Sequence, residues 1–171
     1  QRQMCIRDRN PVAVSRQGAT GLWQFMLGTG KIYGLKNNSL IDERRDPIKS
    51  TWAAARYLKD LYAIYQDWNL VLAAYNCGPG TINKAIRRAG GATDYWTIYN
   101  YLPKETRGYV PAFIAANYIM TYYCEHDICP METQLPSATD TIHIHKDLHL
   151  QQVAEVCNLN IDQLRLSLIH I

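Results

Sequence analysis

The feature that most constrains the fold is a run of helical periodicity between residues 46 and 65. Asp46-Pro47 is a strong helix start, because an acidic N-cap residue precedes a proline at the first helical position. Apolar side chains then recur at spacings of three and four: Ile48, Trp52, Ala55, Leu58, Tyr62 and Tyr65. The pattern predicts an amphipathic helix that buries this face.

Further helix signals follow on both sides of this segment, and no convincing strand pattern occurs within residues 10–125. Glycines at Gly78 and at Gly90-Gly91 are expected to end two of the helices. The remaining helices are expected at residues 21–33 with Thr20 as N-cap, 70–76 with Asn69 as N-cap, 81–89, a short turn capped by Thr93, and 106–125. A compact all-α domain is the prediction.

Residues 110–123 form the most apolar stretch of the chain. This stretch is shorter than the ~20 residues that a membrane-spanning helix needs. We therefore expect it to be a buried central helix. The first residues contain no apolar segment of the kind found in signal peptides, so no leader is expected in this chain.

A second, smaller unit is predicted after a linker at residues 129–139, which is rich in proline and serine. Residues 141–145 alternate between apolar and polar side chains and predict a strand. Helical patterns follow at 148–157 and 161–166. The expected organisation is a helical domain over residues 10–128 and a β-α-α unit over residues 140–166.

The two ends of the chain do not match the patterns beside them. Residues 1–9 have no helical or strand periodicity, and residues 167–171 stop in mid-pattern. We expect both ends to be foreign to the natural protein and exclude them from fold reasoning. Recovery of the same ends from source DNA would contradict this.

Charge and aromatic content narrow the classes of partner. The formal net charge is +3, and residues 1–9 alone contribute +2 through Arg2, Arg7, Arg9 and Asp8. The near-neutral remainder argues against a nucleic-acid-binding protein. The chain has 12 tyrosines and 4 tryptophans but only 2 phenylalanines. Aromatic rings with a polar tip suit a sugar-binding groove, and a tyrosine-rich core is the alternative.

The five cysteines include no C-x-x-C pair, so zinc and thioredoxin-type sites are not indicated. Cys124 and Cys129 are close enough in sequence to pair in an oxidising compartment, and two free thiols are the alternative. No metal or other cofactor is expected.

Three short motifs occur in order after Asn10-Pro11: Gly21-Leu22-Trp23-Gln24, Ala74-Tyr75-Asn76 with Gly78 and Gly80, and Glu105-Thr106-Arg107-Gly108-Tyr109-Val110. Together they resemble the lytic transglycosylases, which cleave peptidoglycan. The similarity covers about residues 10–130 and looks closest to the membrane-bound murein transglycosylase D group. Residues 140–166 resemble the start of a LysM repeat, which members of that group carry after the catalytic domain.

The resemblance implies a lysozyme-like helical fold, a peptidoglycan glycan strand as partner and no cofactor. It implies a monomer in the periplasm or at the outer membrane, with membrane contact only through an anchor on a longer parent. It also implies the substrate-binding residues, which are Ser15, Gln24, Tyr75, Asn76 and Tyr109. Amides and tyrosine hydroxyls can bond a sugar, and Trp23 is expected to pack rather than to touch the glycan.

The acid of the family's reaction is missing from its expected position. The family places its catalytic Glu four residues before the Asn of Asn-Pro, and here that position is Ile6. We assign the role to no other acid. Glu105 is expected to pair with Arg107, and Glu43 is expected in a solvated loop.

Four functions stay open at this point. The first is a lytic transglycosylase whose natural parent carries the Glu, and the second is a glycan-binding module that has lost it. The third is a lysozyme-type hydrolase on the same fold, and the fourth is an unrelated helical interaction domain. Product chemistry separates the first from the third, because a transglycosylase leaves an anhydro end and a hydrolase a reducing end.

Overall fold

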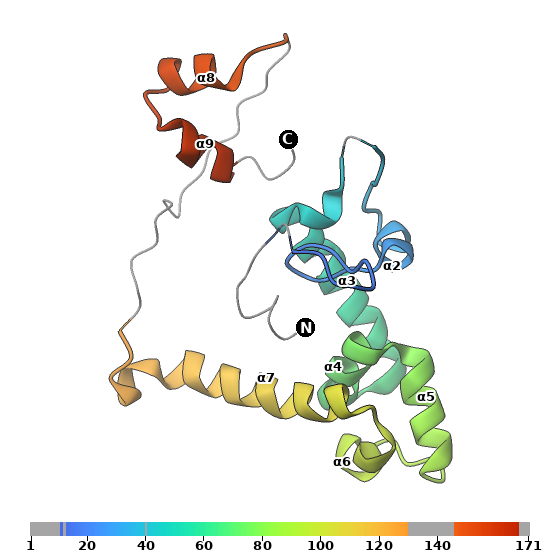
Figure 1. Ribbon diagram of the computed structural model, residues 1–171. Coiled ribbons are helices and arrows are strands. Elements are labelled where there is room, and N and C mark those ends of the chain that lie inside the picture. The colour runs from blue at the N-terminus through green and yellow to red at the C-terminus, as the bar shows by residue number, and fades with distance from the viewer. Residues whose placement is uncertain (1–10, 12, 40, 130–145, 168–171) are drawn as a thin grey trace.

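The computed structural model describes residues 11, 13–39, 41–129 and 146–167. Regular structure within these residues is helical, apart from isolated bridges such as Thr20 with Phe25. The α-helices are α2 (Leu27–Ile32), α3 (Pro47–Tyr65), α4 (Trp68–Cys77), α5 (Pro79–Arg88), α6 (Tyr95–Ile98), α7 (Lys104–Tyr122), α8 (Leu150–Val156) and α9 (Ile161–Ser167) (Figure 1). Three 3-10 turns are η1 (Glu43–Arg45), η2 (Tyr99–Tyr101) and η3 (Tyr123–His126).

The start of α3 is confirmed. The Asp46 carboxylate accepts hydrogen bonds of 2.9 Å from the backbone N–H groups of Ile48 and Lys49, and Pro47 opens the helix. The predicted buried face is correct only in its second half: Ile48 and Trp52 are about 70% exposed, whereas Leu58 and Tyr62 pack against the core and Tyr65 is buried. The face that packs inward contains smaller residues: Ser50, Ala53, Ala54, Leu61 and Tyr65. Alanines at this position let Phe25 and Leu35 approach the helix closely.

Helix α4 is the central helix of the domain. It packs against α3, α5 and α7, and four of its apolar side chains are completely buried: Leu70, Val71, Ala73 and Ala74. The predicted cap at Asn69 is wrong, since Asp67 caps the helix by accepting 2.7 Å from the N–H of Leu70. Gly78 ends α4 at a φ of 85°, as the glycine signal predicted, and α5 begins at the next residue.

Helix α7 is not the buried central helix that its composition predicted. Only Thr106 and Val110 are buried, and they lie in its first turns, which pack against α4. The remaining length extends away from the other helices of the domain (Figure 1). Its exposed large side chains are Phe113, Ile114, Tyr118, Ile119, Met120 and Tyr122. No helix within the described residues is long and apolar enough to cross a membrane.

A proline inside α7 has a specific partner. Pro111 has no N–H to donate to the carbonyl of Arg107, four residues earlier in the helix. The hydroxyl of Tyr95 donates to that carbonyl over 3.1 Å instead, and it lies 3.4 Å from the carbonyl of Thr106. Tyr95 is completely buried, and α6 is thereby joined to α7. The cap of α6 is Asp94 and not Thr93 as predicted.

Two further predictions differ from the structure. Residues 21–24 form a turn, so the first helix begins at Leu27 and Thr20 does not cap it. Glu43 is buried rather than solvated, because its carboxylate accepts from the N–H of Lys36 at 2.7 Å and from the Lys49 ammonium at 2.5 Å. Hydrogen bonding to Lys49 is the main reason why the pKa of Glu43 is lowered.

Helices α8 and α9 confirm the two helices predicted near the C-terminus, and they pack against each other. Several predictions concern residues outside the described part of the chain. They are the strand at residues 141–145, most of the linker, and the foreign ends at residues 1–9 and 168–171.

Candidate functional site

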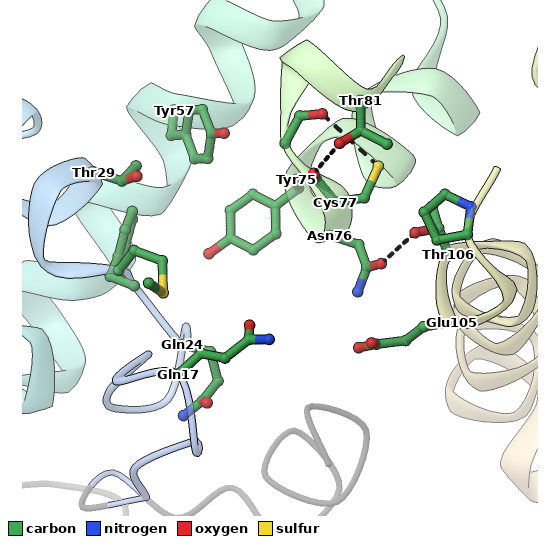
Figure 2. Close-up of a pocket in the computed structure, with 14 residues that line it drawn as sticks. Gln17, Gln24, Thr29, Tyr57, Tyr75, Asn76, Cys77, Thr81, Glu105 and Thr106 are labelled. Atoms are coloured by element: carbon green, nitrogen blue, oxygen red, sulfur yellow. Dashed lines mark hydrogen bonds between the residues drawn. The ribbon is translucent and has the colours of Figure 1, made fainter. Parts of the chain in front are cut away.

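A cavity of about 380 Å³ lies where the three motifs meet (Figure 2). The segment from Gln17 to Thr29 forms one wall. The end of α4 and the start of α5 form a second wall, and Pro103 with the first residues of α7 forms a third. Segments about 80 residues apart in the sequence therefore share one cavity, lined by amide, hydroxyl, carboxyl and aromatic groups.

Gln24 reaches this cavity from a tight turn. Its backbone φ of 50° is unusual for a residue other than glycine. The side-chain Nε2 donates to the carbonyls of Gly21, at 2.8 Å, and Ala13, at 3.3 Å. Within the described part of the chain no donor reaches the buried Oε1. Gln24 thus lines the cavity with its side-chain N–H groups bonded to the backbone and its buried Oε1 an unsatisfied acceptor among the described residues.

Asn76 lines the cavity from the last turn of α4 and is 7% exposed. Its Oδ1 accepts a 2.9 Å hydrogen bond from the hydroxyl of Thr106 (Figure 2). This buried bond joins the second motif to the third, since Thr106 lies in the first turn of α7.

Tyr75 lines the same cavity, and its hydroxyl is already in use. It donates a 2.8 Å hydrogen bond to the backbone carbonyl of Trp23. The Tyr75 ring lies edge-on to Trp23 and Phe25 and 5.3 Å from the ring of Tyr57. The aromatic surface of Tyr75 is therefore what it offers to the cavity, while its hydroxyl supports the turn that carries Gln24.

Two predicted site residues are not among those that line the cavity. The Ser15 hydroxyl oxygen accepts from the N–H of Ala19 at 2.9 Å and closes a local turn. Tyr109 is half-buried on α7. Trp23 packs beside Phe25 and donates from Nε1 to the Thr51 hydroxyl at 2.8 Å, in line with a packing role.

Sequence reasoning missed Glu105 as a cavity residue. Its carboxylate points toward the cavity in Figure 2, and the guanidinium of Arg107 instead lies 5.7 Å from the centre of the Tyr99 ring. The predicted ion pair is wrong because residues two apart in a helix face different directions. This difference in direction between residues two apart was the one sequence signal that could have separated Glu105 from Arg107. Gln17 and Thr81 line the cavity too, and nothing in the sequence singled them out.

No group of three or more metal-ligating side chains occurs among the described residues. Cys124 and Cys129 are exposed free thiols there, which favours the second of the two alternatives. Ile6, the expected position of the acid, lies outside the described residues.

Comparison with known families decides the assignment. The family model of the transglycosylase SLT domain matches residues 8–98, more than half of the chain. The chain belongs to this family. Its matched region includes the first two of the three motifs and ends in α6. Membership of the SLT family also agrees with the helical fold described above.

Individual relatives agree with the SLT assignment. The chain is 33% identical over 160 residues to membrane-bound lytic murein transglycosylase D of Escherichia coli K12, which covers 91% of this chain and 35% of the relative. It is 30% identical over 120 residues to soluble lytic murein transglycosylase of the same strain, and this match covers 67% of the chain and 19% of the relative. The chain thus spans about a third or less of the length of these relatives.

Proposed function

We propose that this chain is the glycan-cleaving domain of a peptidoglycan lytic transglycosylase. The observation that carries the proposal is the meeting of Gln24, Tyr75 and Asn76, from two separate motifs, in one cavity of an SLT-family chain. The names of its relatives, which are murein transglycosylases, support the same substrate class. The site would bind a glycan strand of alternating N-acetylglucosamine and N-acetylmuramic acid.

The proposed reaction breaks the β-1,4 bond between N-acetylmuramic acid and N-acetylglucosamine without water. A glutamic acid protonates the oxygen of the leaving sugar as its bond to C1 breaks. The resulting carboxylate then takes the proton of the 6-hydroxyl of the muramic sugar as that oxygen attacks C1. The acid regains its proton, and the product ends in a 1,6-anhydro ring.

Residues of the cavity have defined parts in this proposal. Gln24 forms part of the wall that the sugar contacts, and the Tyr75 ring packs against the apolar face of the sugar. Asn76 lies in the same wall as Tyr75 and accepts a hydrogen bond from Thr106 of the third wall. Ser15 and Tyr109 would support the surrounding structure rather than touch the sugar, since neither lines the cavity.

The sequence position of the acid sets the sharpest test. Ile6 cannot transfer a proton, so this chain should release little or no anhydro-muropeptide from purified murein. A variant with Ile6→Glu and Arg7→Ser should release it, and mass spectrometry would identify the anhydro end. A matched Ile6→Gln, Arg7→Ser variant keeps the shape of the side chain without the acid and should stay inactive. Rapid turnover by the unaltered chain would contradict the position assigned to the acid.

A glycan-binding module without catalysis is the second candidate, and Ile6 is the observation that favours it. Binding of murein by the unaltered chain, together with no turnover by the Ile6→Glu, Arg7→Ser variant, would select it. A reducing end in place of an anhydro end would select a hydrolase instead.

We propose the remaining organisation on the same basis. Residues 10–128 are the catalytic domain, 129–139 a linker and 140–166 the beginning of a LysM-like unit that also binds peptidoglycan, with foreign residues at 1–9 and 167–171. The protein acts as a monomer in the bacterial cell envelope, in the periplasm or at the outer membrane, and any membrane contact is through an anchor on a longer parent.

A further inference from the structure

A buried arginine lies directly behind the turn that carries Gln24. Arg44 belongs to η1 and is 8% exposed, and it does not line the cavity. Its Nη1 donates to two backbone carbonyls, those of Gly18 at 3.0 Å and Phe25 at 3.1 Å. These two carbonyls lie on either side of the Gly21–Gln24 turn, so one nitrogen joins its two arms.

The other edge of the Arg44 guanidinium is hydrogen-bonded to Asp42. Arg44 Nε and Nη2 donate to the two carboxylate oxygens of Asp42 at 2.9 and 2.7 Å. Burial alone would raise the pKa of the Asp42 carboxyl, but the hydrogen bonds from Arg44 outweigh it and the pKa is lowered. Asp42 therefore stays ionised at neutral pH and neutralises the buried cation. The planar fork of arginine suits this arrangement, since it can bond a carboxylate on one edge and carbonyls on another.

The turn needs such support. Gln24 has a φ of 50°, and a side chain in this left-handed region persists only where its surroundings impose it. Thr20 and Phe25 exchange backbone hydrogen bonds of 3.0 and 3.1 Å at the base of the turn. Gly21 packs so closely on the carbonyl of Arg44 that no Cβ would fit there. Arg44 thus contacts the turn through both its side chain and its backbone.

We propose that Arg44, oriented by Asp42, is a positioning residue that holds Gln24 in the wall of the glycan-binding cavity. This inference rests on the proposed function, because it assumes that the cavity binds peptidoglycan glycan. Arg44 touches no sugar and acts only through Gln24. Its effect on glycan binding should therefore disappear when the Gln24 amide is absent.

A double-mutant cycle tests this dependence in the chain as it stands. The ligand is a soluble tetrasaccharide of alternating N-acetylglucosamine and N-acetylmuramic acid, and its affinity is measured by calorimetry. Arg44→Lys keeps the charge, but one ammonium cannot replace the four hydrogen bonds that the guanidinium makes to Asp42 and the two carbonyls, so affinity should fall about five- to tenfold. Gln24→Ala should cause a similar loss, and the double variant should lose little more than either single variant.

A matched control separates positioning from general stability. Lys49→Ala breaks the ion pair with Glu43, the residue that precedes Arg44 in η1, and leaves the hydrogen bonds of Arg44 itself in place. It should lower the melting temperature and change glycan affinity less than twofold. Asp42→Asn should give a smaller affinity loss than Arg44→Lys, again only when Gln24 is present. If Arg44→Lys reduces affinity equally with and without the Gln24→Ala substitution, the inference is overturned.

A measurement without ligand distinguishes failure of the inference from failure of the proposed function. Arg44→Lys should speed hydrogen exchange at the Thr20 and Phe25 amides about tenfold and shift the side-chain amide resonance of Gln24, and Lys49→Ala should do neither. If the unaltered chain binds no tetrasaccharide, the proposed function is wrong. If the exchange and the Gln24 resonance are unchanged in Arg44→Lys, the positioning role is wrong.

Discussion

The hydroxyl of Tyr75 donates a 2.8 Å hydrogen bond to the backbone carbonyl of Trp23, 52 residues earlier in the chain. This bond connects the end of α4 to the turn that presents Gln24. It gives the tyrosine of the Ala-Tyr-Asn motif a structural task beside its place at the cavity wall.

Tyr75→Phe should therefore destabilise the fold slightly and weaken glycan binding. It keeps the ring and removes one hydrogen bond, so the free energy of unfolding should fall by about 1 kcal/mol. Tyr57→Phe is the matched control, because its ring lies in the same aromatic cluster and no hydrogen bond from its hydroxyl occurs within the described residues. Urea unfolding checks stability, and equal losses in both variants would contradict a specific role for the Tyr75 hydroxyl.

Gly21 and Gly18 make a second matched pair. Both have a positive φ, 82° and 79°, but a Cβ on Gly21 would overlap the carbonyl oxygen of Arg44, whereas Gly18 has open space. Gly18→Ala should cost roughly 1–2 kcal/mol from backbone conformation alone. Gly21→Ala should cost roughly 2–5 kcal/mol, since a steric clash adds to that strain. Urea unfolding measures the loss of stability in each variant. Equal losses would show that the backbone at Arg44 can move to accommodate the Cβ of Gly21→Ala.

Local signals predicted the boundaries of several helices, but not which surfaces they bury. Asp46-Pro47 placed the start of α3, and Gly78 placed the end of α4, because both depend on backbone chemistry within a few residues. The buried face of α3 depends on what packs against it. Alanines there admit Phe25 closely, while larger apolar residues such as Trp52 are exposed.

In the candidate site, too, the sequence identified residues but not the tertiary contacts that they make. Motif resemblance brought Gln24, Tyr75 and Asn76 to attention, and all three line the cavity. Glu43 is predicted in a solvated loop, because no sequence pattern reveals its hydrogen bond from the backbone of Lys36 or those of its neighbour Arg44 to the carbonyls of Gly18 and Phe25. Such contacts arise from tertiary structure alone.

Removing the buried bond between Asn76 and Thr106 should affect stability and glycan affinity together. Asn76→Ala and Thr106→Val each break the 2.9 Å hydrogen bond and should lower the free energy of unfolding by about 1–3 kcal/mol. The double variant should lose less than the sum, since both changes remove the same interaction. Chemical denaturation of the four proteins measures this coupling, and strict additivity would argue against the bond.

Alkaline pH should destabilise the fold through Tyr95. Burial raises the pKa of its phenol from 10.0 to about 12. The folded state therefore retains a proton that the unfolded state loses, so this stabilisation is complete below pH 10 and declines as the pH rises toward 12. Tyr95→Phe should reduce the pH dependence of the melting temperature in that window, although it also loses the hydrogen bond to Arg107 at every pH.

Tyr33 needs its own control in this experiment, because burial and Asp60 raise its pKa to about 12 as well. Tyr33→Phe should remove a separate part of the alkaline dependence while leaving the α6–α7 contact intact. Circular dichroism melts between pH 8 and 12 would measure each contribution. An alkaline dependence that is unchanged by Tyr95→Phe would show that the phenol ionises without cost in the folded protein, contrary to its complete burial between α6 and α7.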